Sequence, residues 1–185
     1  MYIIAKYNYI DKNRKLVSDT WFDEVEDFFN GYAKVELYRK WNLIDKNGKL
    51  LSDTWFDDVG DFINDRVIVC LKDKFNLIDK NGKQISSIWF DDCDNIFDKY
   101  FNVQLGDKFT IVDADCQPIR NIWFDRCDYF LDRCALVELD NKFNLLYTDG
   151  ELWSDMWYDY IEHARHPGHA YIYLNNERKE IDAVY

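Results

Sequence analysis

The chain has 185 residues, a formal net charge of −12 and an aromatic content of 18%. This length can bury a sizeable core, and so many aromatic side chains exclude a disordered acidic tail. No apolar run approaches the roughly 18 residues of a membrane-spanning helix, and the first residues lack the pattern of a secretory signal. The charge argues against direct binding to nucleic acid or anionic lipid. We therefore expect a cytoplasmic protein with no membrane or nucleic-acid partner.

A tripeptide of Trp, a second aromatic residue and Asp recurs every 34 residues without a slip. It occurs at Trp21-Phe22-Asp23, Trp55-Phe56-Asp57, Trp89-Phe90-Asp91, Trp123-Phe124-Asp125 and Trp157-Tyr158-Asp159. Another aromatic column in the same register consists of Tyr7, Trp41, Phe75, Phe109 and Phe143. A fixed period of this length is the signature of a repeat architecture.

The first two elements of a repeat are clearest after residue 66. Residues 67–71 alternate apolar and other side chains, which predicts a strand. Residues 75–79 predict a second strand, separated from the first by a short polar turn. Asn81-Gly82 then predicts a tight turn, because both residues tolerate positive φ.

The rest of the repeat contains the aromatic tripeptide. Residues 84–90 predict a third strand that is apolar and aromatic. Asp91-Asp92 opens a connector that could hold a single helical turn, with Asp as its cap. Each repeat is therefore expected to consist of about three short strands.

These patterns predict an all-β, open repeat solenoid of five 34-residue units with an extra terminal hairpin. The hairpin segment 35–45 is matched at both ends of the chain, so it occurs six times against five aromatic tripeptides. A closed propeller needs a whole number of units, so the extra hairpin favours an open stack. We expect a single domain with units of about 1–34, 35–68, 69–102, 103–136 and 137–171, and a C-terminal cap at 172–185.

Residues 40–49, with the sequence Lys-Trp-Asn-Leu-Ile-Asp-Lys-Asn-Gly-Lys, resemble the core of the bacterial WG repeat, also called KWG. Residues 56–59 and 90–93 resemble its second half. Departures from the family pattern include an Asn in place of glycine at Asn42, Asn76 and Asn144. The resemblance covers essentially the whole chain and implies β-repeat architecture in bacteria or their mobile elements. It implies no catalytic residues and no cofactor.

The aromatic and acidic columns each have a structural and a functional interpretation. The Trp21 column could form a ligand platform, but we favour core, as also for Trp153, since aromatic side chains bury large areas. The Asp column could bind calcium, but calcium sites use a glycine-bearing loop with many oxygens, so turn capping is favoured. That column consists of Asp23, Asp57, Asp91, Asp125 and Asp159.

The remaining reactive residues give no catalytic pattern. His163, His166 and His169 could bind zinc or nickel, but Pro167-Gly168 interrupts any helix and no nearby Cys completes a set, so we expect a surface loop. Cys93 and Cys127 occupy a column of apolar residues and are expected to be buried and inert. No phosphate-binding loop, nucleophile elbow or zinc-binding helix is present. We therefore expect a protein that is not an enzyme.

Acidic residues gather after each Trp-Phe pair, and −8 of the net charge lies in residues 84–151. Stacked units would align these residues in an acidic ridge, which either keeps the protein soluble or contacts a basic partner surface. The candidate partner-binding residues of this ridge are Asp57, Asp58, Asp61, Asp91, Asp92, Asp94, Asp98, Asp125, Asp128 and Asp132.

Our functional hypothesis is a non-enzymatic module for protein–protein interaction. Its most concrete form is an acidic inhibitor or adaptor that docks on a basic, nucleic-acid-binding surface of a partner, because charge complementarity speeds association. A phage or mobile-element inhibitor of a host defence nuclease is one example. The alternative is a carbohydrate- or cell-envelope-binding protein that uses aromatic side chains between units.

Overall fold

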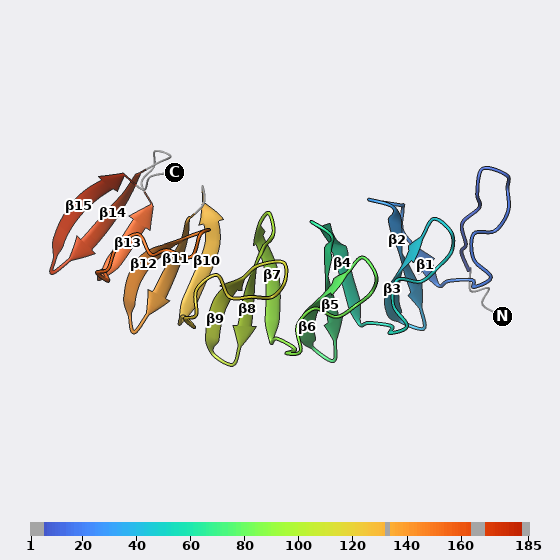
Figure 1. Ribbon diagram of the computed structural model, residues 1–185, viewed down its shortest axis with the longest axis horizontal. Helices are drawn as coiled ribbons and strands as arrows, with labels where there is room; N and C mark the ends of the chain where they lie inside the picture. The colour runs from blue at the N-terminus through green and yellow to red at the C-terminus, as the bar shows by residue number, and fades with distance from the viewer. Residues whose placement is uncertain (1–5, 132–133, 164–168, 183–185) are drawn as a thin grey trace, which may run out of the picture. The chain divides into compact units, whose positions relative to one another are not determined.

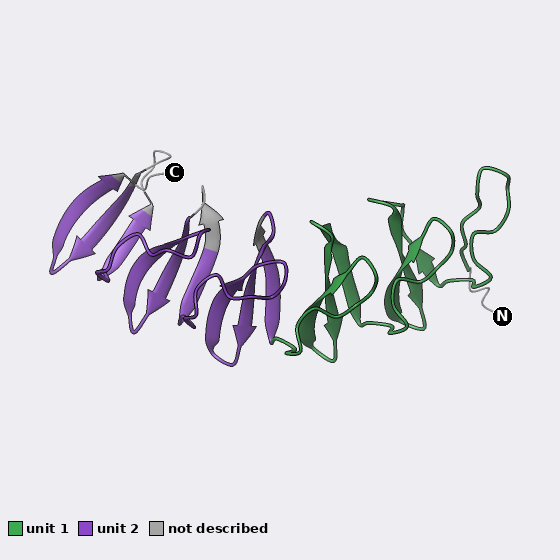
Figure 2. Cartoon of the chain, viewed as in Figure 1, with its two compact units in different colours: residues 1–90 green, residues 91–185 purple. Residues whose placement is uncertain are grey.

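The computed structural model describes residues 6–131, 134–163 and 169–182. Within these residues the chain forms only β-strands and no helix (Figure 1). It divides into two compact units, residues 1–90 and residues 91–185, which we call unit 1 and unit 2 (Figure 2). The described residues include no helix that is long and apolar enough to cross a membrane.

Unit 1 contains two sheets, each with three antiparallel strands that follow one another in chain order. The first sheet consists of β1 (Glu24–Val25), β2 (Tyr32–Leu37) and β3 (Lys40–Asp45). The second consists of β4 (Asp58–Ile63), β5 (Arg66–Leu71) and β6 (Lys74–Asp79). Residues 6–23 precede these sheets and make two isolated bridges, between Tyr7 and Phe22 and between Ile10 and Leu16.

Unit 2 contains three sheets of the same kind. They consist of β7 (Asp92–Phe97), β8 (Tyr100–Leu105) and β9 (Lys108–Val112), then β10 (Arg126–Leu131), β11 (Cys134–Leu139) and β12 (Lys142–Tyr147), then β13 (Tyr160–His163), β14 (His169–Leu174) and β15 (Glu177–Asp182). No sheet among the described residues closes on itself. The expectation of an all-β, open repeat fold with three strands in each repeat is confirmed.

Tight turns join the second and third strands of each sheet. In the second sheet the turn is Lys72-Asp73, and both residues have positive φ, 54° and 58°. Two positive φ values give a turn whose twist matches that of the flanking strands. The pairing of Leu71 with Lys74 closes this hairpin directly. The predicted strands at 67–71 and 75–79 and the turn between them are confirmed.

The third strand of the repeat lies elsewhere than predicted. Residues 84–90 form no strand and make two isolated bridges to β6, Ile78 with Gln84 and Phe75 with Phe90. The strand begins instead after the aromatic-Asp pair, as β7 does at Asp92, where a helical turn was expected. Both predictions were wrong because the apolar character of 84–90 comes from packing over the sheet and not from pairing within it.

The core contains the second aromatic residue of each tripeptide rather than the Trp. Phe22, Phe56, Phe90, Phe124 and Tyr158 are all at most 4% exposed. The Trp residues are half-buried lids, except Trp21, which is 51% exposed. Trp55, for example, packs against the core around Phe22 and Val35. The prediction of core for the Trp column is therefore corrected to a covering role, which half-buried Trp153 shares beside Tyr158.

Buried asparagines hold the loop that carries the tripeptide. Asn42, Asn76 and Asn144 are at most 1% exposed and stand where the WG pattern has glycine. The amide of Asn76 donates to the carbonyl oxygens of Ser86 (3.0 Å) and Ile88 (2.8 Å). Its Oδ1 accepts from the N–H groups of Leu77 (2.8 Å) and Ser86 (3.2 Å). One side chain thus satisfies backbone groups that a strand ladder would otherwise pair.

Candidate functional site

The Asp of the second tripeptide connects the two successive sheets of unit 1. Asp57 lies between β3 and β4, and its Oδ1 forms an ion pair with Lys40 at the start of β3. Its Oδ2 accepts a hydrogen bond of 2.7 Å from the N–H of Lys72, in the turn between β5 and β6. The Lys40 ammonium and the Lys72 N–H hold the pKa of Asp57 below its usual range. We call this arrangement of Lys, Asp and turn N–H the clamp.

The clamp recurs along the chain. Asp23 pairs with Lys6 and accepts from Tyr38 N–H, and Asp125 pairs with Lys108 and accepts from Asp140 N–H. Asp159 does the same with Lys142 and Asn175 N–H, and Asp91 accepts from Gly106 N–H at 2.8 Å. The prediction of turn capping for the Asp column is confirmed. Three candidate ridge residues, Asp57, Asp91 and Asp125, therefore have a structural role in the repeat.

Two further candidates lie on β4 in unit 1. Asp58 is exposed, and its Oδ1 accepts from the N–H of Val59 at 2.8 Å. Asp61 forms an ion pair of 2.9 Å with Lys34, which belongs to β2 of the preceding sheet. Asp61 thus links two sheets and meets a cation within its own unit, whereas Asp58 has no cationic partner among the described residues.

Asp92 and Asp94 form an exposed carboxylate pair on β7 in unit 2. They are two residues apart on one strand, so their side chains leave the same face. Asp92 accepts from the N–H of Cys93 at 2.9 Å, and neither carboxylate has a cationic partner within the described ranges. Partial burial, and then the charge of Asp92, raise the pKa of Asp94 above its usual range. The negative charge of Asp94 is therefore poorly compensated within the described part of the chain.

The other candidates in unit 2 differ from this pair. Asp128 forms a two-pronged ion pair with Arg126, with distances of 2.8 and 2.9 Å. Asp98 lies in the turn after β7 with a φ of 47°, and its carbonyl oxygen accepts from Asn95. Asp132 lies outside the described residues. The sequence therefore grouped carboxylates that the structure places in several different environments.

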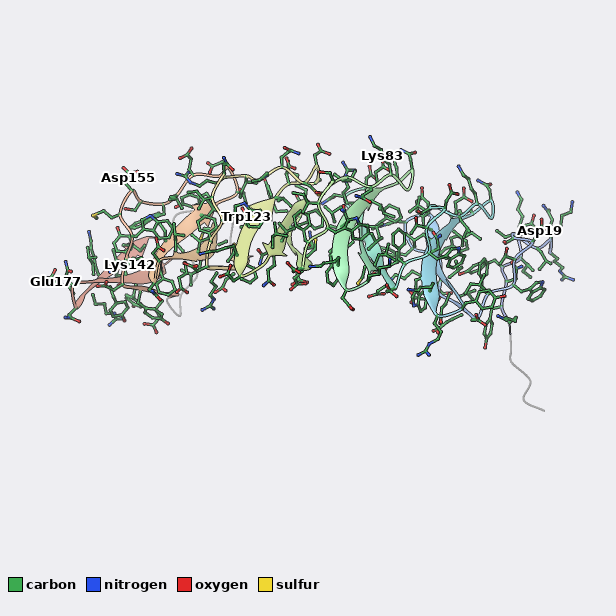
Figure 3. The ribbon with its side chains drawn as sticks, turned by 90° about the horizontal axis from the view of Figure 1, so that it is seen from below. Asp19, Lys83, Trp123, Lys142, Asp155 and Glu177 are labelled. Carbon is green, nitrogen blue, oxygen red and sulfur yellow. The ribbon has the colours of Figure 1, made fainter. Side chains whose placement is uncertain are left out.

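The division of the chain sharpens the charge pattern. Unit 1 contains 14 basic and 15 acidic residues, a net charge of −1, whereas unit 2 contains 9 basic and 20 acidic residues, a net charge of −11. Cations gather in unit 1 in the loop at residues 11–15 and at the turns after β3 and β6, where Lys83 points outward (Figure 3). These exposed cations are Lys12, Arg14, Lys15, Lys46, Lys49, Lys80 and Lys83. The acidity that the sequence located in 84–151 thus belongs to unit 2.

Within the described ranges, the histidine and cysteine candidates form no metal-binding group. His163 ends β13 and His169 begins β14, whereas His166 lies outside the described residues. In the described part of the chain no group of His, Cys, Asp and Glu is arranged to hold a metal ion. Cys93 and Cys127 are buried as predicted, and burial raises the pKa of both thiols, that of Cys127 to about 12. A thiol with so high a pKa is a poor nucleophile at neutral pH.

A family model described as the WG containing repeat matches residues 9–41, 43–75 and 77–109, which is more than half of the chain. The chain belongs to the WG repeat family. The WG repeat is a binding module rather than a known enzyme family, which supports a role in protein–protein interaction. A search of curated proteins gives no significant match.

Several solved structures are similar to the chain at low identity. They include Kluyveromyces lactis Hsv2 (11% identity, TM-score 0.41, covering 82% of this chain and 57% of that chain) and the N-terminal domain of Nup159 (10%, 0.43, 77% and 49%). A third is apo AztD from Citrobacter koseri (16%, 0.40, 78% and 52%). The chain spans about half the length of these proteins, and at such TM-scores the likenesses carry no argument about function.

Proposed function

We propose that this WG repeat protein is a non-enzymatic module whose acidic unit 2 docks on a basic surface of a partner protein, as an inhibitor or adaptor. The observation that supports this proposal is the unequal division of charge, −11 in unit 2 against −1 in unit 1. Such a concentration of one sign creates a field that steers an oppositely charged partner and raises the association rate.

The exposed pair Asp92 and Asp94 is the best contact point for a cationic partner. The clamp carboxylates already neutralise a Lys and bind a turn N–H, so a partner would gain little from them. The charge of Asp94 is disfavoured in the free protein, as its raised pKa shows. An Arg or Lys from a partner would relieve this cost, since an opposite charge favours the ionised carboxylate.

The most specific form of the proposal is an inhibitor that occupies a nucleic-acid channel. Surfaces that bind a phosphate backbone are rich in Lys and Arg. Unit 2, with a net charge of −11 and the exposed pair Asp92 and Asp94, presents the negative charge that such a surface attracts. The partner is therefore expected to be a protein with a basic nucleic-acid-binding surface, and its nucleic acid is expected to compete with this chain.

The test is affinity capture from nuclease-treated lysate of the native host, at low and high salt, followed by rate measurements with the captured partner. The double variant Asp92→Asn, Asp94→Asn should slow association at least about fivefold at low salt, and far less at high salt. The matched control removes two exposed charges from unit 1, by Asp53→Asn with Asp73→Asn, and should change the rate little.

One result would overturn the proposal as a whole, and a second would overturn its nucleic-acid-channel form. One is a partner that binds the unit 2 variant and the unit 1 control at equal rates. The other is a partner whose binding is unaffected by an excess of its own nucleic acid, which would leave the adaptor role and remove the channel.

A further inference from the structure

One column of the repeat contains a polar residue where three other repeats have leucine. The column consists of Leu16, Leu50, Gln84, Pro118 and Leu152. Leu50 packs against the core of the first sheet, and Leu152 against the core around Phe124. Gln84 instead is exposed, and its side-chain amide donates to the carbonyl oxygen of Ser86 at 2.6 Å.

A hollow of about 320 Å³ lies where a leucine at position 84 would pack. Its apolar wall consists of Phe56, Leu71, Ile78 and Trp89. These residues lie one period after Phe22, Leu37, Ile44 and Trp55, which belong to the core cluster that Leu50 packs against. All of them belong to unit 1. The volume is at the lower end of the roughly 300–1,000 Å³ typical of small-molecule sites. Gln84, which replaces the leucine of this column, is itself one of the lining residues.

The rim of the hollow is polar and uncharged. Ser52, Thr54 and Gln84 line it, and no charged side chain of the described residues does. The Ser52 hydroxyl accepts from the Thr54 N–H at 3.1 Å, which leaves its proton to donate. The Thr54 hydroxyl can donate and accept. In a chain with 31% charged residues, an uncharged rim over an aromatic wall favours a neutral ligand with both an apolar face and hydroxyl groups.

We propose that this hollow binds an uncharged pyranose sugar. The apolar face of the ring would lie against Trp89, because aromatic rings supply large rigid contact area. The sugar hydroxyls would exchange hydrogen bonds with Ser52, Thr54 and the Gln84 amide. The proposal is independent of the acidic surface, since every lining residue belongs to unit 1.

Ligand-observed NMR and Trp fluorescence of the full chain test the proposal. The probes are methyl glucopyranoside, methyl galactopyranoside and methyl N-acetylglucosaminide, at up to about 50 mM, where millimolar binding is saturated. We expect at least one to bind, and glucuronate to bind at least fivefold more weakly, because its carboxylate meets no cation at the rim.

The variant Gln84→Leu should refill the hollow. We expect it to raise the thermal midpoint of unfolding and to weaken sugar binding at least tenfold. The matched control Gln117→Leu, on an exposed turn in unit 2, should leave sugar binding unchanged. The reverse variant Leu50→Gln should open the equivalent hollow in the preceding repeat and add a second sugar site.

Three outcomes would overturn the proposal. The first is that none of the methyl pyranosides binds the wild-type chain. The second is that Gln84→Leu binds them as tightly as the wild type does. The third is that indole, which has no sugar hydroxyls, binds more tightly than every pyranoside, which would show that the hollow selects apolar ligands.

Discussion

At the residue scale, the buried asparagines are the feature that most distinguishes these repeats. Each replaces the small glycine of the family pattern with a side chain that binds two carbonyl oxygens and accepts from nearby N–H groups. A buried polar group is stable only when it is paired, and here four bonds on Asn42 and Asn76 and three on Asn144 achieve this. The loop that carries the aromatic tripeptide is thereby fixed without a strand ladder.

The variant Asn76→Ala tests this role. It removes the partner of the Ser86 and Ile88 carbonyl oxygens in a site that is 0% exposed. Buried groups without partners cost about 1–3 kcal/mol each, so we expect a loss of about 2–4 kcal/mol in the free energy of unfolding. Urea denaturation followed by Trp fluorescence measures it.

A milder substitution provides the control for this experiment. Thr110 occupies the same column in the third sheet, and its hydroxyl donates to the Ile122 carbonyl oxygen at 2.9 Å. Asn76→Thr should therefore recover part of the stability that Asn76→Ala loses. Equal losses in the two variants, or a loss below about 0.5 kcal/mol in Asn76→Ala, would contradict the role.

The sequence showed that these asparagines were unusual but not what they do. Their carbonyl partners lie 10 and 12 residues further on, in a segment that the periodicity assigned to a strand. A hydrogen bond between a side chain and a distant loop leaves no period in the sequence. The role of Gln84 was visible in principle, since it breaks a column of leucines, but only the hollow gives that break a meaning.

At the element scale, the turns that contain Gly48, Gly82 and Gly150 lie against the loop of the preceding repeat. Gly82 has a φ of +77°, and a Cβ there would lie 1.9 Å from the carbonyl oxygen of Leu51. Cys116 occupies the same column with a φ of 55°, so positive φ alone does not demand glycine. The close approach to the neighbouring loop is what excludes a side chain from Gly82.

The pair Gly82→Ala and Gly31→Ala separates these two effects. Gly31 also has positive φ, +92°, but a Cβ there would meet no described atom within 4 Å. Gly31→Ala should cost about 1–2 kcal/mol from backbone strain. Gly82→Ala should cost at least about 2 kcal/mol more, from the clash with Leu51. Equal losses of stability in chemical denaturation would show that the repeats are not in close contact at this turn.

The clamps give the fold a defined acid sensitivity. Hydrogen bonds from a Lys and from a turn N–H lower the pKa of Asp23, Asp57, Asp125 and Asp159. As the pH falls below about 4, the unfolded chain takes up these protons first. The stability that the clamps contribute is therefore complete above that pH and is lost as the pH falls through the lowered pKa values.

Stability measured in urea from pH 6 to pH 2 checks this expectation. Replacing all four clamp residues with Asn keeps an acceptor for the turn N–H but removes the ionisable group. The quadruple variant should be less stable than the wild type at pH 6, and the difference should shrink toward pH 2. A difference that is constant across this range would rule out ionised clamps.

The strands and turns that the sequence predicted correctly are those with a local signal. Residues 67–71 alternate by side chain, and the turn at Lys72-Asp73 follows from the two flanking strands. The sequence did not predict β7, which has three acidic residues at or next to its start: Asp91, Asp92 and Asp94. Asp is depleted in strands. Pairing with β8 and the burial of Cys93 override that composition.

At the scale of the whole molecule, charge and packing divide the chain at the same place. A sum over sequence windows located −8 in residues 84–151, but the boundary at residue 90 assigns −11 to unit 2. The sequence could predict that acid was concentrated, and it could not predict which carboxylates are clamped. To recognise a clamped carboxylate one must know its Lys partner. For Asp57 and Asp125 this partner lies 17 residues earlier, at the start of the last strand of the preceding sheet.

Each unit also has its own buried cores, which leads to a prediction about unfolding. Trp55 covers the core around Phe22 in unit 1, and Trp157 covers the core around Phe124 in unit 2. Trp→Ala at such half-buried sites should cost about 3 kcal/mol. Because repeat proteins are held by contacts between neighbours, Trp55→Ala should speed amide exchange mainly in β1–β6, and Trp157→Ala mainly in β7–β15.

Hydrogen exchange of the full chain, read by mass spectrometry, distinguishes this local response from a global one. Each variant is the control for the other, since both remove the same side chain from equivalent positions of the repeat. Faster exchange confined to the unit that carries the substitution would show that the two units open separately. Equal acceleration along the whole chain in both variants would show instead that the chain unfolds as one cooperative body, in which the loss of a single lid is shared by every sheet.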